Sequence, residues 1–305
     1  MQTKKIWIIR TGALGDFILT LPVIQNLRHH FPSAQIHLLG NLKTLTLASE
    51  EVDHIHDINS TVWAPLFALE SDLSPQLIEK SANTDLVISY LPDTDGLFTR
   101  NLKRAGVQKV ITHPPKPPED GSIHTIDHLL QPLQNLDIPS HTTQPAIHFT
   151  QADFEMAHLP TKPTLLVHPG SGGAPKRWPA EHFITLINNI SKHHSILVSA
   201  GPADGELAQH IVAQTQANLL SQLPIRRFAA LMTKCSAYLG NDSGPSHLAA
   251  AVGLPTLALF GPTDPHIWSP RSATVHTLQA SDGQMPSISP DQVISKLLEI
   301  MPVTS

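Results

Sequence analysis

Short apolar segments alternate with helix-patterned segments along almost the entire chain. Runs rich in Ile, Leu and Val occur at residues 6–9, 35–39, 85–90, 109–112, 164–168, 195–199, 237–240 and 256–260. Most segments between them carry apolar residues three and four positions apart, which is the period of an amphipathic helix. Because strands that alternate with helices form parallel sheets with helices on both faces, the sequence predicts an α/β fold with doubly wound sheets.

The length and the punctuation of the chain indicate two domains. Its 305 residues are about twice the usual domain length, and strands alternate with helices in both halves. The Pro-rich residues 113–122 precede a further helical pattern, so we interpret them as an exposed loop. The linker is expected near residues 138–163, with a new strand opening at residues 161–163. We predict two Rossmann-like domains, residues 1–150 and 151–305, that face a cleft.

Composition excludes several classes of protein. Hydrophobic residues make up 41% of the chain and charged residues 15%, which excludes intrinsic disorder as the main state. Cys235 is the only cysteine, so no intrachain disulfide or thiolate-rich zinc site can form, and the 19 histidines show no metal-ligand spacing. No apolar run reaches about 18 residues and no secretory signal is evident, so we expect a cytoplasmic protein.

The charge of the chain is unevenly divided. The net charge of −5 argues against a nucleic-acid partner. Residues 1–155 carry 11 Lys and Arg against 17 Asp and Glu, whereas the remaining residues carry 9 against 8. The second half is therefore the better place for an anionic ligand.

One candidate anion site follows the strand expected at residues 164–168. The segment HPGSGGAPKRWP contains three glycines, Ser171, and the adjacent cations Lys176 and Arg177. Glycines let the backbone approach a ligand closely, and the two cations supply the charge that a pyrophosphate needs. The segment matches neither the P-loop nor the GxGxxG motif, which disfavours a nicotinamide dehydrogenase. The alternative is a flexible loop with solvated cations.

A second candidate anion site follows the strand expected at residues 237–240. There Asp242, Ser243 and Gly244 lead directly into a helical pattern. The first N–H groups of a helix have no intrahelical partners, and the helix dipole adds positive charge at that end. The alternative is a Ser or Asp cap with a glycine in the turn.

Two acidic residues also follow strands. Asp16 lies in the segment Gly12-Ala-Leu-Gly15-Asp16, just before a helical pattern at residues 17–30. An Asp in this position serves either as a general base in a cleft or as a helix cap. Glu206 follows the strand expected at residues 195–199, where it either hydrogen-bonds a ribose or stabilises a helix N-terminus.

The segments IRTGALGDFILTLPVIQNLR, HPGSGGAPKRWPAEHF and GNDSGPSHLAAAVGLPTLALFGPTDP together resemble glycosyltransferase family 9, the ADP-heptose:lipopolysaccharide heptosyltransferases and their relatives. The three motifs span nearly the whole chain. The resemblance implies a GT-B architecture in which the N-terminal domain takes the acceptor and the C-terminal domain the nucleotide-sugar. It also implies inverting transfer of a sugar, heptose from ADP-heptose, to a saccharide acceptor such as a lipopolysaccharide core. Neither a divalent metal nor another cofactor is essential in this chemistry.

The resemblance also assigns roles to individual residues. Asp16, in the acceptor-side loop with Gly12 and Gly15, would be the base that deprotonates the acceptor hydroxyl. Lys176 would neutralise the leaving diphosphate, with backbone N–H groups of Ser243 and Gly244 as further donors. The complete expected donor-binding set is Ser171 on a phosphate, Lys176, Arg177, Glu206 on the ribose, Leu223 beside the nucleobase, and Asp242, Ser243, Gly244 and His247 at the second turn.

Partners follow from these expectations. We expect a monomer with a nucleotide-sugar donor and a saccharide or glycolipid acceptor. Peripheral contact with the cytoplasmic face of the inner membrane, through Trp63, Phe67 or residues 113–118, would reach a lipid-linked acceptor. The acidic first half weakens transfer to a phosphorylated lipopolysaccharide core, so another acceptor remains open. Two further interpretations remain: a non-catalytic nucleotide-sugar-binding protein, and a GT-B-like sugar-nucleotide epimerase or hydrolase.

Overall fold

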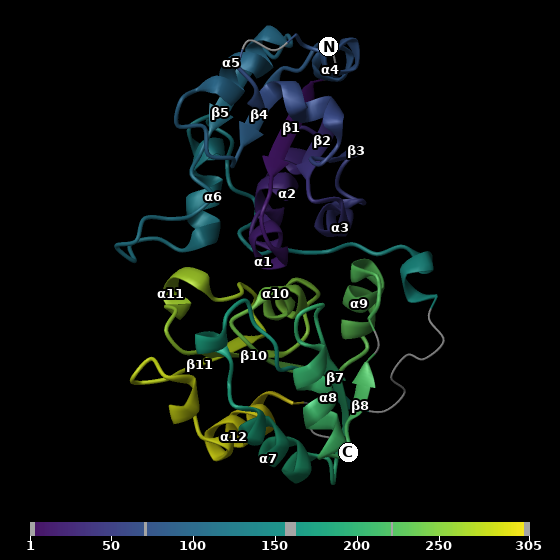
Figure 1. Cartoon of the computed structure of the whole chain (residues 1–305), viewed down its shortest axis with the longest axis vertical. Coiled ribbons are helices and arrows are strands. Elements are labelled where there is room, and N and C mark those ends of the chain that lie inside the picture. Colours follow the sequence, from purple (N-terminus) through teal and green to yellow (C-terminus); the bar gives the residue numbers. More distant parts are fainter. Residues whose placement is uncertain (1–3, 70–71, 156–162, 221, 302–305) are drawn as a thin grey trace. The chain divides into compact units, whose positions relative to one another are not determined.

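The computed structural model describes residues 4–69, 72–155, 163–220 and 222–301 (Figure 1). Contacts between Cα atoms divide the chain into two compact units, Met1–Thr143 and Gln144–Ser305. Residues 161 and 162, where a new strand was expected to open, lie outside the described residues. Each unit is an α/β structure with a parallel sheet, so the predicted fold class is confirmed.

Hydrogen bonds on either side of Gln144 explain where the two units divide. The side chain of Asn26 in the first unit bonds the backbone of Thr142. The guanidinium of Arg226 in the second unit donates to the backbone carbonyl of His148. The chain between these two anchors therefore passes from one unit to the other.

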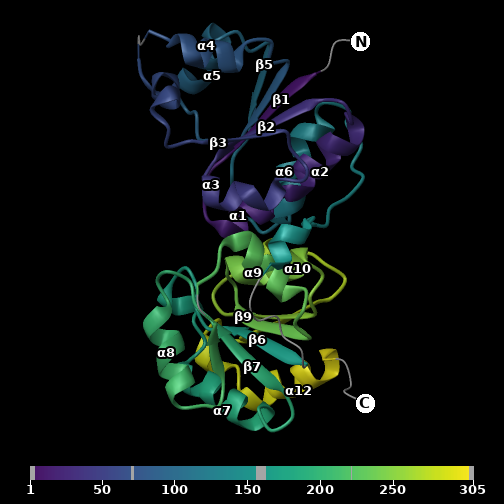
Figure 2. The same ribbon diagram turned by 90° about the vertical axis from the view of Figure 1, so that its right-hand side faces the viewer.

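A five-stranded parallel sheet, of order β3-β2-β1-β4-β5, forms the first unit. Strand β1 is central, and its residues are buried on both faces, with Trp7 and Ile9 on one and Ile6 and Ile8 on the other. Figure 2 shows α2 and α6 on one side of the sheet and α4 and α5 on the other. The strands are β1 Lys5–Arg10, β2 Gln35–Gly40, β3 His54–Asp57, β4 Leu86–Ser89 and β5 Lys109–Thr112. The helices and 3-10 turns are α1 Leu14–Ile18, α2 Leu21–His30, α3 Leu42–Leu45, η1 Thr46–Ala48, η2 Thr61–Phe67, α4 Pro75–Ser81, α5 Leu97–Arg104 and α6 Thr125–Gln134.

The helical pattern expected at residues 17–30 forms two helices, with the second starting beside Pro22, where the sequence allowed a kink or a late helix start. Helix α1 begins earlier, at Leu14, and ends at Ile18. Helix α2 then begins at Leu21, so the helical conformation is interrupted near Thr20. Pro22 occupies the first turn of α2, where its missing N–H costs no helical hydrogen bond. The hydroxyl of Thr20 donates to the carbonyl of Asp16 at 2.9 Å, which satisfies a carbonyl at the end of α1.

A six-stranded parallel sheet, of order β11-β10-β9-β6-β7-β8, forms the second unit. Its core lies between the sheet and the helices α7, α8 and α12, of which α7 contacts the other two. Helices α9 and α10 contact each other separately. The strands are β6 Thr164–His168, β7 Ser195–Ser199, β8 Asn218–Leu220, β9 Ala237–Asn241, β10 Thr256–Phe260 and β11 Val275–Gln279. The helices and 3-10 turns are η3 Gln151–Phe154, η4 Ala174–Lys176, α7 Ala180–Ile190, α8 Gly205–Ala213, α9 Ile225–Met232, α10 Gly244–Ala251, α11 Pro265–Trp268, η5 Met285–Ser287 and α12 Pro290–Ile300.

The strand order of the second sheet brings three loops together. Strand β6 lies between β9 and β7, with Leu166 opposite Tyr238 on one side and Leu197 on the other. All three strands are parallel, so the loops that follow them leave the same edge of the sheet. In open α/β sheets this carboxyl edge is where ligands bind. The glycine-rich loop after β6 is thus flanked by the β9–α10 turn and the β7–α8 loop.

Candidate functional site

The first cation of the glycine-rich loop is held by the β9–α10 turn. The Lys176 ammonium lies 2.7 Å from Oδ2 of Asp242, and this carboxylate is buried whereas Lys176 is one-third exposed. The same oxygen accepts a hydrogen bond from the hydroxyl of Thr263 at 2.7 Å. Lys176 has three N–H donors and uses one here. It is therefore fixed in place while keeping donors for a ligand.

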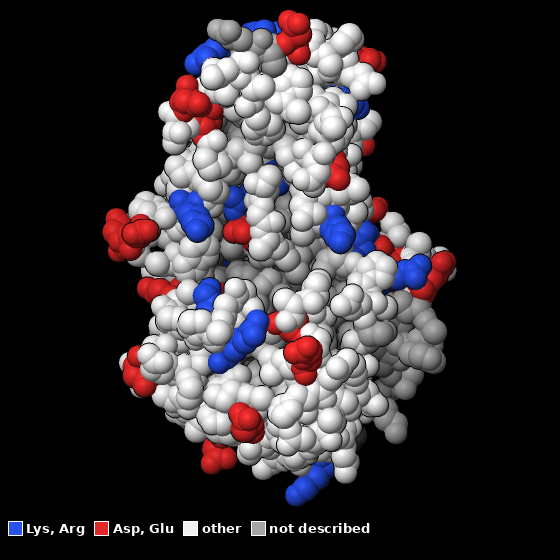
Figure 3. Space-filling view, viewed as in Figure 1, with Lys and Arg blue, Asp and Glu red and all other residues white. Residues whose placement is uncertain are grey.

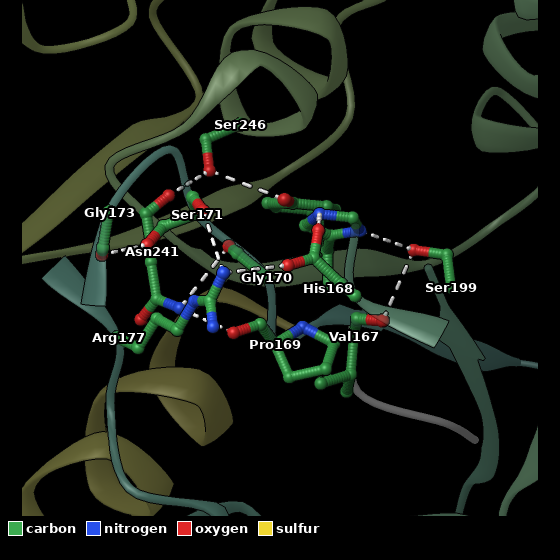
Figure 4. Close-up of polar contacts among 12 residues, drawn as sticks. Val167, His168, Pro169, Gly170, Ser171, Gly173, Arg177, Ser199, Asn241 and Ser246 are labelled. Carbon is green, nitrogen blue, oxygen red and sulfur yellow. Dashed lines mark hydrogen bonds and ion pairs between the residues drawn. The ribbon is translucent and has the colours of Figure 1, made fainter. Parts of the chain in front are cut away.

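The second cation of the loop is held from the opposite side. Nη2 of Arg177 lies 3.2 Å from Oδ1 of the buried Asp204, which belongs to the β7–α8 loop. Nη2 also lies 3.4 Å from the carbonyl of Ser171. Figure 4 shows Arg177 reaching back across its own loop in this way. The two consecutive cations therefore reach in opposite directions, to carboxylates that follow the two strands flanking β6.

The side chain of Asn241 ties the glycine-rich loop to the end of β9. Its amide Nδ2 donates to the carbonyls of Pro169 and Gly170, and its Oδ1 accepts from the backbone N–H of Trp178 at 3.1 Å. Asn241 is completely buried, and Figure 4 shows its contacts with the loop residues Pro169 and Gly170. The geometry of the loop is therefore set by packed protein groups before any ligand binds.

The start of α10 provides the second candidate anion site. Ser243 is the N-cap residue, but its side chain makes no capping hydrogen bond. The hydroxyl of Ser246 turns inward instead and donates to the carbonyl of Asn241. Side-chain capping by Ser243, the alternative weighed for this turn, is therefore not what the structure shows. The N-terminal turn of α10 lies beside the Lys176–Asp242 pair, since Asp242 directly precedes Ser243.

Asp16 in the first unit lies in the first turn of α1, where its carboxylate bonds the N-cap residue Ala13 and also forms an ion pair. Its Oδ2 accepts from the backbone N–H of Ala13 at 2.8 Å, and its Oδ1 lies 3.4 Å from Nη2 of Arg10. The Asp16 side chain is 31% exposed, whereas that of Arg10 is buried. Gly12 has a φ of +122°, and a Cβ there would lie 2.7 Å from the carboxylate. The loop therefore presents one face of the Asp16 carboxylate to solvent.

The remaining expected site residues occupy varied positions. Ser171 hydrogen-bonds the carbonyl of Gly173 within its own loop at 2.8 Å. Glu206 is exposed on the first turn of α8, and Leu223 is half-buried in the segment before α9. His247 is buried on α10.

Several polar residues that hold the candidate residues of each unit were missed by sequence reasoning. Asp204 lies two residues before Glu206 and points under the glycine-rich loop, while Asn241, Thr263 and Arg10 hold the carbonyls or carboxylates described above. Arg10 and Asn241 end apolar strands, where a polar residue signals a position at the carboxyl edge. Nothing in the local pattern distinguishes Asp204 from Glu206, because either could have been the inward-facing acid.

A histidine lies behind the glycine-rich loop and is uncharged at neutral pH. His168 ends β6 and is buried, with Nδ1 3.1 Å from the Ser199 hydroxyl and Nε2 3.9 Å from Oδ2 of Asp204. Burial lowers its pKa to about 4, although the nearby Asp204 carboxylate acts in the opposite direction. The charge on Asp204 is therefore balanced chiefly by Arg177.

Within the described ranges, no cluster of three or more His, Cys, Asp or Glu side chains is arranged to hold a metal ion. Among the same residues, none of the helices has the length and apolarity needed to cross a bilayer. Figure 3 shows basic and acidic side chains interspersed on the face viewed, rather than gathered into a basic patch.

Comparison with known structures defines the class to which this fold belongs. A solved structure of glycosyl transferase family 9 from Veillonella parvula DSM 2008 superposes with a TM-score of 0.80 at 22% identity, covering 98% of both chains. The Escherichia coli heptosyltransferase WaaC with ADP gives a TM-score of 0.75 at 18% identity, covering 97% of this chain and 99% of that one. The fold is therefore that of the GT-B glycosyltransferases.

Sequence comparison leads to the family. Lipopolysaccharide heptosyltransferase 3 of Escherichia coli (strain K12) is 26% identical over 321 residues, covering 94% of this chain and 92% of that protein. Lipooligosaccharide heptosyltransferase 2 of Campylobacter jejuni subsp. jejuni serotype O:6 is 26% identical over 281 residues, covering 85% and 82%. The model of glycosyltransferase family 9 (heptosyltransferase) matches residues 108–297. The chain belongs to this family and is a glycosyltransferase.

Proposed function

We propose that the chain is an inverting, metal-independent heptosyltransferase that uses ADP-heptose as donor. The donor diphosphate binds at the carboxyl edge of the second sheet, among the glycine-rich loop, the β7–α8 loop and the first turn of α10. The observation that carries this proposal is the pair of adjacent cations, Lys176 and Arg177, each fixed by a buried carboxylate beside a helix N-terminus. Fixed cations and backbone N–H groups stabilise developing negative charge better than mobile water does.

Space for the diphosphate is provided by the outer part of the glycine-rich loop. A Cβ on Gly172 would meet nothing within 4 Å, and one on Gly173 would meet only the ring of Pro175 at 3.8 Å. The backbone of these two residues is therefore open to a ligand. Ser171, Ser243 and Gly244 would donate to the phosphate oxygens, with Leu223 beside the nucleobase, Glu206 on the ribose, and His247 and Asp242 shaping the turn.

The transfer would be a single displacement. An acceptor hydroxyl oxygen attacks the anomeric carbon of the heptose while the bond from that carbon to the phosphate oxygen breaks. The hydroxyl proton passes to the Asp16 carboxylate, and the electron pair of the broken bond stays on ADP, whose charge Lys176 neutralises. Attack opposite the leaving group inverts the anomeric configuration. A base and a cation suffice for this step, so no metal or other cofactor is included.

The acceptor is proposed to be a saccharide or glycolipid of the kind found in a lipopolysaccharide core. The named relatives are lipopolysaccharide and lipooligosaccharide heptosyltransferases. The acidic first half of this chain favours an acceptor less phosphorylated than an inner core, and an acceptor screen should include both kinds.

The chain is further proposed to act as a cytoplasmic monomer in peripheral contact with the inner membrane. Phe67 and Leu69 are 49% and 74% exposed, and Ile78 on the adjacent α4 is 47% exposed. Trp63, the other aromatic expected at the membrane, is buried and belongs to the core. Cosedimentation with lipid vesicles, compared with a Phe67→Ser/Leu69→Ser variant, measures this contact.

Calorimetric titration with ADP, UDP and GDP, first without metal and then with magnesium, tests the donor site. We expect ADP to bind preferentially in both conditions. Absence of binding by all three nucleotides would contradict the assignment of Lys176, Ser243 and Gly244. ADP binding that requires magnesium would contradict the metal-independent mechanism alone.

Replacing the proposed base tests the chemistry separately. Asp16→Asn keeps the size of the side chain and should lower kcat by about 10²–10⁴-fold, the usual contribution of a general base. ADP affinity should stay the same, because the proposed donor contacts are all in the second unit. Glu79→Gln, an exposed carboxylate of α4, is the matched control. Wild-type turnover in the Asp16→Asn variant would show that another group takes the proton.

A further inference from the structure

The first glycine of the glycine-rich loop has a packing partner inside the protein. A Cβ on Gly170 would lie 2.1 Å from Oδ2 and 2.3 Å from Cγ of Asp204. A side chain at residue 170 would require the Asp204 carboxylate to move, so the absence of a Cβ on Gly170 allows this carboxylate to approach the loop backbone. Gly172, two residues further on, faces open space. The two ends of the loop therefore have different roles.

The Asp204 carboxylate is buried against this backbone, and its contacts converge on Arg177. Oδ1 lies 3.2 Å from Nη2 of Arg177, and Oδ2 faces the neutral His168 at 3.9 Å. A buried carboxylate is costly unless it is paired, and Arg177 is the cation that pairs it here. Nη2 also donates to the Ser171 carbonyl, which links the pair to the loop backbone.

The guanidinium of Arg177 is not fully satisfied by these contacts. Its Nε is buried and has no hydrogen-bond partner among the residues the structure describes. Its side chain as a whole is 36% exposed. A planar guanidinium held at one nitrogen has its remaining N–H groups oriented before a ligand arrives, so less rotational freedom is lost on binding.

We propose that Asp204 is a positioning residue, which acts through Arg177 to hold the guanidinium and the Gly170–Ser171 backbone in the conformation that binds the donor diphosphate. This inference rests on the proposed function, because it takes the diphosphate to bind at this loop. It assigns Asp204 to the phosphates and not to the ribose. A carboxylate packed beneath Gly170 and paired with Arg177 has no oxygen directed toward a sugar hydroxyl.

The proposal predicts a selective loss of affinity. Asp204→Asn keeps the shape of the side chain but removes the charge that fixes Arg177. ADP affinity should fall about 10-fold, in the range measured for a hydrogen bond to a charged group. Affinity for adenosine, which has no phosphate, should change by less than about 2-fold. A residue that merely supported the fold would weaken both ligands together.

A matched control exists elsewhere in the same unit. Asp153 is also buried and pairs with an arginine, since its Oδ1 accepts from Nε of Arg226 at 2.8 Å. Asp153→Asn should lower the unfolding temperature as Asp204→Asn does, but should leave ADP affinity unchanged. In an Arg177→Ala background, Asp204→Asn should cause no further loss of ADP affinity, because its effect passes through Arg177.

The opposite outcome is equally clear. Removing a negative charge near a diphosphate also reduces repulsion, so a rise in ADP affinity on Asp204→Asn would overturn the proposal, as would an unchanged affinity. If the Asp204→Asn variant does not fold, Gly170→Ala tests the same contact by displacing the carboxylate, with the same ADP-selective loss expected. Failure of the unaltered chain to bind ADP would overturn the proposed function and this inference with it.

Discussion

Two adjacent residues of the same charge have different surroundings in this protein. Lys176 reaches the buried Asp242 after β9, and Arg177 reaches the buried Asp204 after β7. The sequence shows a dibasic pair and predicts the attraction of an anion. It does not predict that each cation is fixed by its own carboxylate, since that depends on β6 lying between β9 and β7. The identity of the two residues thus predicts an anionic ligand, whereas the order of the strands determines where each cation is held.

The Lys176 side chain should matter for turnover as well as for the pairing of the buried Asp242. Lys176→Met keeps the length of the side chain and removes the ammonium, so we expect kcat with saturating donor to fall by about 10²–10³-fold, the usual cost of losing one charge-stabilising donor. The measurement is a steady-state assay, with Lys192→Met, an exposed lysine between α7 and β7, as control. A fall in both variants would indicate a general loss of charge and not a local role.

Gly12 is needed for the conformation of the Asp16 loop. An alanine there would adopt a strained φ of +122° and place its Cβ 2.7 Å from the Asp16 carboxylate. Gly12→Ala should therefore lower the free energy of unfolding by about 1–3 kcal/mol and reduce kcat with it. Gly106→Ala is a suitable control, because it also has positive φ but no atom within 4 Å of the added Cβ. Equal stability loss with unchanged kcat in both variants would remove Gly12 from the site.

At the scale of elements, periodicity predicted the buried strands well and the exposed or interrupted elements poorly. The runs at residues 164–168, 237–240 and 256–260 are strands with every residue buried, so their apolar character is unbroken. Strand β11 and helix α11 have no counterpart in the prediction. β11 is an edge strand in which no residue is buried, and α11 is a single turn capped by Asp264. Such elements form because a neighbour is already in place.

The end of β9 should contribute measurably to stability through one side chain. Asn241→Ala leaves the Trp178 N–H and the Pro169 carbonyl without their partner in a fully buried position. Each buried polar group left unsatisfied costs about 1–3 kcal/mol, so we expect unfolding to become easier by roughly 3 kcal/mol. Chemical denaturation checks this value. Asn188→Ala, an exposed amide of α7, should stay within about 0.5 kcal/mol of the unaltered chain.

At the scale of the whole molecule, the sequence predicted the fold class and the family correctly, and it placed the candidate anion site at the carboxyl edge of the second sheet. It did not predict which buried side chains hold the glycine-rich loop in place. Asp204 and Glu206 differ by two positions, and only the packing of Gly170 decides which of them turns inward. The burial of the histidines is a second property that depends on packing. Their number can be counted in the sequence, but the sequence does not predict which of them are buried.

Three histidines that are buried or half-buried should make the stability of both units depend on pH. Burial lowers the pKa of His168 in the second unit to about 4, and that of His37 and His113 in the first unit to about 3 and about 4. In the unfolded chain these groups take up protons near pH 6.5. The unfolded state therefore binds more protons than the folded state between about pH 6.5 and pH 4, so stability is full above that window and falls as the pH drops through it.

Carboxylates should add to this loss only at lower pH. Hydrogen bonds from Arg226 hold the pKa of Asp153 at about 2, so its contribution is lost below about pH 4. Unfolding temperatures measured from pH 8 to pH 3 should be level down to about pH 6.5, decline to pH 4, and decline further below it. His168→Gln should make the decline between pH 6.5 and pH 4 shallower, because one fewer proton is taken up on unfolding. An unfolding temperature that stays constant from pH 7 to pH 4.5 would mean that these rings are protonated in the folded chain.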